Sequence, residues 1–177
     1  MTEILPSPEE LQPLDELTEA LYESLKGIAR RTLGRQSSMI NGTDLVHEAY
    51  LELARDEKYR SMHRTHFMAL CATFVRRLLV REAVELRRQK FDPCLITAVD
   101  LGMESHETSF ELLELDRILK RLAEIDERQA KIVELRFFGG MTGEEVATLL
   151  GISRRTVTKE WGMARAWLKR ELEREAE

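Results

Sequence analysis

Cysteine is scarce in this chain of 177 residues, which contains only two. Cys71 and Cys94 lie far apart, and neither belongs to a Cys-x-x-Cys pair or to a Cys/His cluster. This spacing argues against a disulfide framework and against a zinc site. Histidine is scarce too, and His63 and His66, three residues apart, have no third ligand nearby. We therefore predict no metal, no cofactor and no enzymatic activity.

Long apolar runs are also missing, which argues against a membrane-spanning helix. The first residues carry Glu3, Glu9 and Glu10, where a secretory signal would need positive charge followed by an apolar segment. We therefore expect a soluble, cytoplasmic protein with no membrane partner.

Lysine and arginine are absent from two long stretches, so the net charge of -5 conceals a strong segregation. Residues 1–19 contain six acids, and residues 91–116 contain seven, with no Lys or Arg in either. In contrast, residues 76–90 and residues 153–170 each contain six Lys or Arg. Two basic segments separated by acidic ones indicate two nucleic-acid contact surfaces on one chain.

Alternation with period two is missing as well, whereas apolar residues recur at steps of three and four. The chain is therefore predicted to be all-α, with helices over about 14–32, 43–55 and 65–88. Between 91 and 107 this periodicity disappears, which predicts a flexible acidic linker. It divides the chain into two small helical domains, 1–90 and 108–177. The second is expected to open with a capping box, Thr108-x-x-Glu111.

A helix-turn-helix is predicted near the C-terminus. Thr142 and Glu145 have the spacing of a capping box, Gly151 permits a left-handed turn, and Ser153 is positioned to cap the next helix. Val157 faces back across the turn. A recognition helix meets DNA at its N-terminal end. The predicted DNA contacts here are Ser153, Arg154, Arg155, Thr156, Thr158 and Lys159. The alternative is an amphipathic helical hairpin with a solvated basic face.

The stretch from Arg128 to Ala147 resembles the promoter-reading domain of bacterial sigma factors of the extracytoplasmic-function (ECF) type. The segment from Asp44 to Leu53 is similar to the helix with which this family docks on the clamp helices of the RNA polymerase largest subunit. The segment 67–90 is similar to the reader of the minus-ten promoter element, and the C-terminal hairpin to the reader of the minus-thirty-five element. The resemblance covers nearly the whole chain from about Leu14, in the order typical of the family. It implies a sigma factor that binds core polymerase and directs promoter-specific initiation.

The docking helix can also be interpreted from its residues alone. Asp44, His47, Glu48 and Leu51 share a face distinct from the buried stripe, and an exposed leucine ringed by polar groups suits a protein partner. The alternative is a solvated face with one stray leucine. Including the start of the helix, the predicted polymerase contacts are Asn41, Thr43, Asp44, His47, Glu48 and Leu51.

Five cations on the third helix could follow a phosphate backbone. The alternative is again a solvated charged face. The predicted DNA contacts on this helix are Arg76, Arg77, Arg81, Arg87 and Arg88.

The chain departs from the family's pattern at the start of the docking helix, where Asn41 stands in place of a common acid. We predict that phosphorylation of Thr43 by a Ser/Thr kinase supplies the missing charge; the alternative is that Thr43 only caps the helix. An anti-sigma factor is the other candidate controlling partner. A second departure is Gly162, where a basic residue is frequent in the recognition helix.

The rival interpretation of the whole chain is a stand-alone helix-turn-helix regulator whose N-terminal half serves dimerisation or sensing. The basic segment at 76–90, for which such a domain has little use, argues against it.

Overall fold

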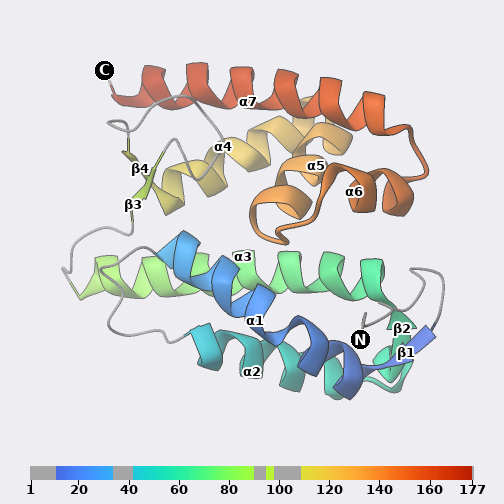
Figure 1. Cartoon of the computed structure of the whole chain (residues 1–177). Helices are drawn as coiled ribbons and strands as arrows, with labels where there is room; N and C mark the ends of the chain where they lie inside the picture. Colours follow the sequence, from blue (N-terminus) through green and yellow to red (C-terminus); the bar gives the residue numbers. More distant parts are fainter. Residues whose placement is uncertain (1–10, 34–41, 90–94, 98–108, 177) are drawn as a thin grey trace.

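A computed structural model describes residues 11–33, 42–89, 95–97 and 109–176. The fold over these residues is all-α, as the sequence predicts (Figure 1). The α-helices are α1 (Leu14–Leu33), α2 (Gly42–Ala54), α3 (Arg64–Arg88), α4 (Leu112–Ile125), α5 (Glu127–Phe137), α6 (Gly143–Leu150) and α7 (Arg154–Ala176), with a short 3-10 helix at Glu57–Tyr59. None of the helices described is long and apolar enough to cross a membrane.

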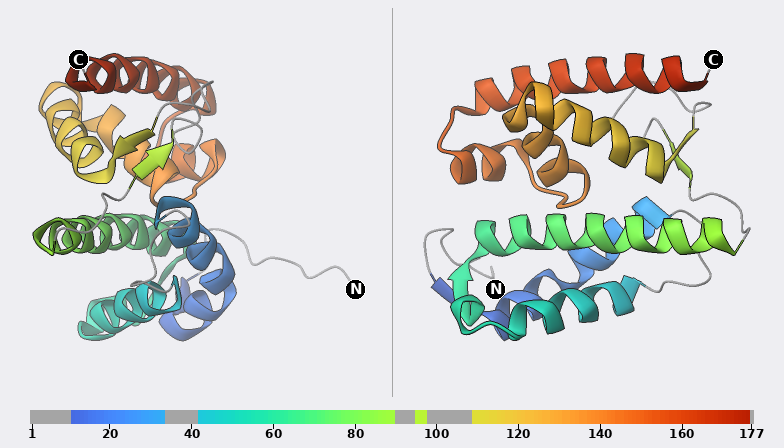
Figure 2. Two further views of the ribbon diagram at one scale, coloured as in Figure 1. Left: turned by 90° about the vertical axis from the view of Figure 1, so that its left-hand side faces the viewer. Right: turned by 180° about the vertical axis from the view of Figure 1, so that it is seen from behind.

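The central element is α3, which lies between α1 and α2 on one side and the C-terminal helices on the other, as three different views agree (Figures 1 and 2). It contacts α1 and α2 as well as α4, α5 and α6. The buried apolar residues of both halves accordingly form one continuous cluster. A helix covered on two sides carries a broad apolar stripe. In α3 the buried apolar residues are Phe67, Met68, Cys71, Ala72, Val75, Leu79 and Ala83.

Two small antiparallel strand pairs accompany the helices. Strand β1 (Leu11–Pro13) pairs with β2 (Ser61–His63), and β3 (Leu95–Thr97) pairs with β4 (Ser109–Glu111). Leu11 lies opposite His63, and Leu95 lies opposite Glu111. The sequence predicted no strand because three residues are too few to show alternation with period two.

The predicted linker, 91–107, lies mostly outside the described residues. Its described part is β3, which is paired to the segment just before α4. The capping box predicted at Thr108 and Glu111 is wrong in register. Thr108 is outside the described residues, and Glu111 is itself the N-cap of α4, with its N–H donating to Glu114 at 3.3 Å. The box is thus formed by Glu111 and Glu114, with glutamate in place of the threonine that the pattern suggested.

The capping box at the start of α6 is confirmed. The backbone N–H of Thr142 donates to Glu145 at 2.8 Å, and the N–H of Glu145 donates back to the Thr142 hydroxyl at 3.2 Å. The helix ends at Gly151, whose φ of 64° lies in the left-handed region that glycine adopts without strain. The N–H of Ile152 then returns to the carbonyl of Ala147 at 3.1 Å. These bonds fix the short turn between α6 and α7.

Candidate nucleic-acid interface

The first turns of α7 carry an exposed basic surface. We call its residues the α7 surface: Ser153, Arg154, Arg155, Thr156, Thr158 and Lys159. All are exposed except Thr156, which is half-buried. The hydroxyl of Ser153 accepts a hydrogen bond from the N–H of Thr156 at 3.0 Å, so the predicted cap is present. The structure thus brings these predicted residues together at one helix N-terminus, where the positive end of the helix dipole adds to the charge of the side chains.

The opposite face of α7 anchors the helix. Val157, Ala164, Leu168 and Leu172 are buried in the core. Buried Glu160 forms a bidentate ion pair with Arg128 of α5, in which the Nε of Arg128 donates to Glu160 at 2.8 Å. A forked pair of this kind fixes orientation as well as distance. The α7 surface is therefore held outward by packing and by a charge pair on the other side of the same helix.

Farther along α7, the ring of Trp161 is close to two cations. The guanidinium of Arg136 is 4.7 Å from the centre of its ring, and that of Arg165 is 5.7 Å away. The partial burial of Arg136 lowers its pKa, and the positive charge of nearby Arg165 lowers it further. Trp161 is half-buried against the core, as suits a packing residue rather than one on which a base stacks.

Gly162 is exposed on α7, and beyond its chain neighbours and the adjacent backbone of its own helix no described atom lies within 4 Å of the position a Cβ would take. Gly162→Ala should raise the free energy of unfolding by about 0.5–1 kcal/mol, because glycine is the poorer helix former. Gly162→Lys should raise the free energy of unfolding by a similar amount. If this side of α7 faces DNA, the lysine should also steepen the salt dependence of DNA binding by about one phosphate contact. Denaturant unfolding and salt titrations measure the two effects. The alanine variant is the control for helix propensity, and equal salt slopes for both variants would place Gly162 away from the DNA.

A second candidate surface lies on α2. Asp44, His47, Glu48 and Leu51, which we call the α2 face, are all exposed, and the side chain of Leu51 is 46% exposed. Val46, Ala49 and Leu53 are buried on the other side of the helix. The two predicted faces of α2 are therefore distinct in the structure. Asn41, also predicted to contact polymerase, lies outside the described residues.

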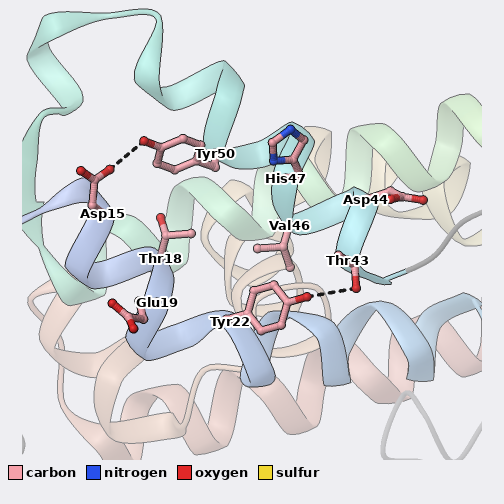
Figure 3. A pocket seen from close by; sticks show the side chains of 9 residues that line it. All are labelled: Asp15, Thr18, Glu19, Tyr22, Thr43, Asp44, Val46, His47 and Tyr50. Atoms are coloured by element: carbon pink, nitrogen blue, oxygen red, sulfur yellow. Dashed lines mark hydrogen bonds between the residues drawn. The ribbon is translucent and has the colours of Figure 1, made fainter.

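An open hollow of about 540 Å³ lies between α1 and α2, next to the α2 face (Figure 3). Asp44 and His47 belong to both the hollow and the α2 face. On the α1 side Asp15 accepts a hydrogen bond from the hydroxyl of Tyr50 at 2.7 Å, and this bond raises the pKa of Tyr50. The bond ties the end of α2 to the start of α1.

Thr43 lies at the rim of this hollow, in the first turn of α2. Its hydroxyl accepts a hydrogen bond of 3.0 Å from the hydroxyl of Tyr22 in α1 (Figure 3). The side chain is half-buried. Because α2 begins at Gly42, Thr43 is the second residue of the helix and its hydroxyl links two helices.

The five cations predicted on α3 do not lie on one surface. Arg77, Arg81, Arg87 and Arg88 are exposed. Arg81 pairs with Glu48 of the α2 face at 2.8 Å, and Arg87 is 3.9 Å from Glu111. Exposed pairs of this kind contribute little to stability and can exchange for other partners.

Arg76 differs from the other α3 cations because it points at the C-terminal half and is only 15% exposed. Its Nε donates to Asp116 of α4 at 2.8 Å, and its Nη1 donates to Glu134 of α5 at 3.0 Å. Burial would raise the pKa of Glu134, but hydrogen bonds from Lys131, Thr73 and Arg76 outweigh it and lower the pKa overall. The carboxylate is therefore charged and paired. We call Arg76, Asp116 and Glu134 the Arg76 network.

Sequence reasoning missed Asp116 and Glu134. Each has a local signal, since Asp116 follows buried Leu115 and Glu134 lies between buried Val133 and Leu135. An acid inside an apolar stripe predicts a buried partner, because an unpaired buried carboxylate is costly. This signal does not reveal which cation pairs with each acid, because Arg76 is 40 residues from Asp116 and 58 residues from Glu134 in the sequence.

In the part of the chain that the structure describes, no group of three or more His, Cys, Asp or Glu is placed so that it could hold a metal ion. The rings of His63 and His66 are 6.1 Å apart and tilted. Cys71 is buried in the core, and burial raises the pKa of its thiol to about 12.

A family model described as "ECF sigma factor" matches residues 12–174. The match spans both halves, from β1 to α7. No curated protein and no solved structure matches the chain.

Proposed function

The chain belongs to the ECF sigma factor family, and from this premise we propose that it binds core RNA polymerase through the α2 face and directs initiation at promoters read by α3 and the α7 surface. The observation that carries the proposal is the family match over both halves. A factor of this kind needs a polymerase contact and two promoter contacts on one chain. The α2 face, the exposed cations of α3 and the α7 surface are the three candidates, and the first two adjoin where Arg81 pairs with Glu48.

The α2 face supports a protein contact because its leucine is exposed among polar side chains. Apolar groups surrounded by polar ones are typical of interface centres, where exclusion of water strengthens the contact. The clamp helices of the polymerase largest subunit are the partner that the family resemblance implies.

The α7 surface supports readout of the minus-thirty-five element. Arg154, Arg155 and Lys159 are exposed beside Thr158, at the helix end that can approach base edges and phosphates. On α3, the exposed cations Arg77, Arg81 and Arg88 are the proposed contacts to the minus-ten element. Arg76 becomes available to DNA only when it leaves its partners.

The rival function is that of a stand-alone regulator. It is separated from a sigma factor by mixing the full-length protein with purified core polymerase and testing for a stoichiometric complex and for run-off transcripts from genomic fragments. A sigma factor gives both. DNA binding without a polymerase complex would favour the regulator.

We also propose that Thr43 is phosphorylated by a Ser/Thr kinase. Its hydroxyl lies at the rim of an open hollow beside Asp44 of the α2 face. A phosphate in the first turn of α2 would add a charge of about -1.5 to -2, favoured by the helix dipole. It would make the polymerase-docking end of α2 more acidic. An anti-sigma factor is the alternative means of control.

Thr43→Ala should abolish promoter activity in cells, and Thr43→Glu should restore part of it without the kinase, because the carboxylate supplies some of the phosphate's charge. Reporter transcription and mass spectrometry of the purified protein measure this. Tyr22→Phe is the matched control, since it removes the hydrogen bond to Thr43 but keeps the phosphate acceptor. If Thr43 has only a structural role, the Ala variant should lose only about 1 kcal/mol of stability and keep its activity.

A further inference from the structure

The hollow between α1 and α2 is large enough to hold a small molecule. Its volume of about 540 Å³ falls within the range of roughly 300–1,000 Å³ that is usual for ligand sites in proteins. The walls are mostly apolar and include the rings of Tyr22 and Tyr50 and the side chain of Val46 (Figure 3). Such a lining favours a ligand with an aromatic or other apolar body.

The rim of the hollow carries negative charge on both sides. Asp15 and Glu19 lie on α1 and Asp44 lies on α2, and all three, which we call the rim acids, are exposed (Figure 3). None of the 9 described residues that line the hollow is Lys or Arg. Three carboxylates around a mostly apolar surface favour a cation over a neutral or anionic ligand.

The ring of Tyr22 already attracts one cation of the chain itself. The ammonium of Lys26, one turn farther along α1, is 5.3 Å from the centre of this ring, a distance typical of a cation–π contact. Lys26 also pairs with Glu23 at 3.4 Å, which offsets its charge. The hollow thus combines carboxylates with an aromatic ring that a cation approaches, and both kinds of group attract organic ammonium ions.

We propose that the hollow between α1 and α2 is a binding site for a small organic cation, an ammonium compound with an aromatic body. The ammonium lies among the rim acids, and the aromatic body lies against the two tyrosines. Because Asp44 and His47 belong to both the hollow and the α2 face, the bound cation competes with core polymerase for this part of α2. The competition rests on the proposed function, whereas binding of the cation does not.

Three probes with the same indole body separate the effect of charge from that of shape: cationic tryptamine, neutral tryptophol and anionic indoleacetate. Each is titrated into the isotope-labelled full-length protein, and binding is followed by the amide chemical shifts. Since each exposed ion pair contributes a factor of roughly 1.5–5, tryptamine should bind about tenfold more tightly than tryptophol, and indoleacetate more weakly than either. The amides that respond to tryptamine should lie in α1 and α2 at the hollow.

Glu19→Gln should weaken binding of tryptamine by a factor of about 1.5–5 and leave binding of tryptophol unchanged, because it removes one rim charge at almost constant volume. Glu19 is exposed and lies outside the α2 face, so the substitution keeps the fold and the proposed polymerase contact in place. The matched control is Glu16→Gln, which removes an exposed acid of the same helix that does not line the hollow. It should bind tryptamine like wild type.

Competition is measured by titrating labelled full-length protein with core polymerase in the presence of each probe. Tryptamine at about nine times its own Kd should raise the apparent Kd for polymerase about tenfold, as mutually exclusive binding requires. Tryptophol at the same concentration should raise it only about twofold, because its own affinity is lower.

Equal affinities for tryptamine and tryptophol, equal affinities of the Glu19 and Glu16 variants, or shifts confined to other parts of the chain would overturn the cation site. Shifts at the hollow that follow protein concentration without any probe would assign it to a second copy of the chain and overturn the site as well. Saturating tryptamine that leaves polymerase affinity unchanged would overturn the competition. If the protein binds no polymerase, the proposed function fails, while the tryptamine titration of the free protein still decides whether the site exists.

Discussion

Leu51→Asp should weaken binding of core polymerase by about 2–4 kcal/mol, or roughly 30- to 800-fold in Kd, and leave the fold intact. Leu51 is exposed in the free protein, so the aspartate is well hydrated before binding. At the interface it would have to lose this water next to two further acids, Glu48 and Asp44, which makes its burial costly. Fluorescence anisotropy of a labelled protein titrated with core polymerase measures the loss.

The matched control for this variant is Ile125→Asp. Ile125 is an exposed apolar residue at the end of α4, 69% exposed and outside the proposed surfaces. It should bind polymerase like wild type, and both variants should unfold at the wild-type denaturant midpoint. Wild-type binding by the Leu51 variant would show that the α2 face is not the polymerase contact.

Loss of Arg154, Arg155 and Lys159 together should reduce binding of a duplex carrying the minus-thirty-five element by several orders of magnitude at low salt. Each phosphate contact contributes about 0.9 to the slope of log K against log salt, so the slope should fall by about 3 if all three touch phosphate. A guanine read by one of the arginines would add about 1–3 kcal/mol of discrimination at one position. Salt titrations on the natural and on a scrambled element separate the two contributions.

The control for net charge is Arg55→Ala/Lys58→Ala/Arg60→Ala, which removes three exposed cations far from α7 in the chain. Its salt slope should stay close to that of wild type. Recognition of the element by the α7 variant with an unchanged slope would rule out the α7 surface as the contact.

The helices were predictable from the sequence because their signals are local. Leu14, Leu17 and Leu21 are buried as their spacing predicts, and α1, α2 and α3 begin within one residue of the expected starts. The capping box of Thr142 and Glu145 and the cap at Ser153 are confirmed for the same reason, since each depends on residues three apart.

The environment of Arg76 could not be predicted in this way. Arg76 and Arg77 are neighbours in a basic segment, yet one is enclosed by α4 and α5 and the other is exposed. Which side of α3 is covered depends on contacts with helices more than 30 residues away. The two short strand pairs were missed because three-residue strands leave no pattern, and the capping box of α4 because glutamate is an unusual N-cap.

The position of α3 between the two halves limits how members of this family can be recombined. A chimaera joined within 91–107 would give α3 a foreign C-terminal half, and Arg76 would keep its charge without the acids that neutralise it. Exchange of halves should therefore succeed only where the donor carries acids at the positions of Asp116 and Glu134, or where Arg76 is exchanged along with them. Among related chains, substitutions at these three positions should therefore occur together rather than singly.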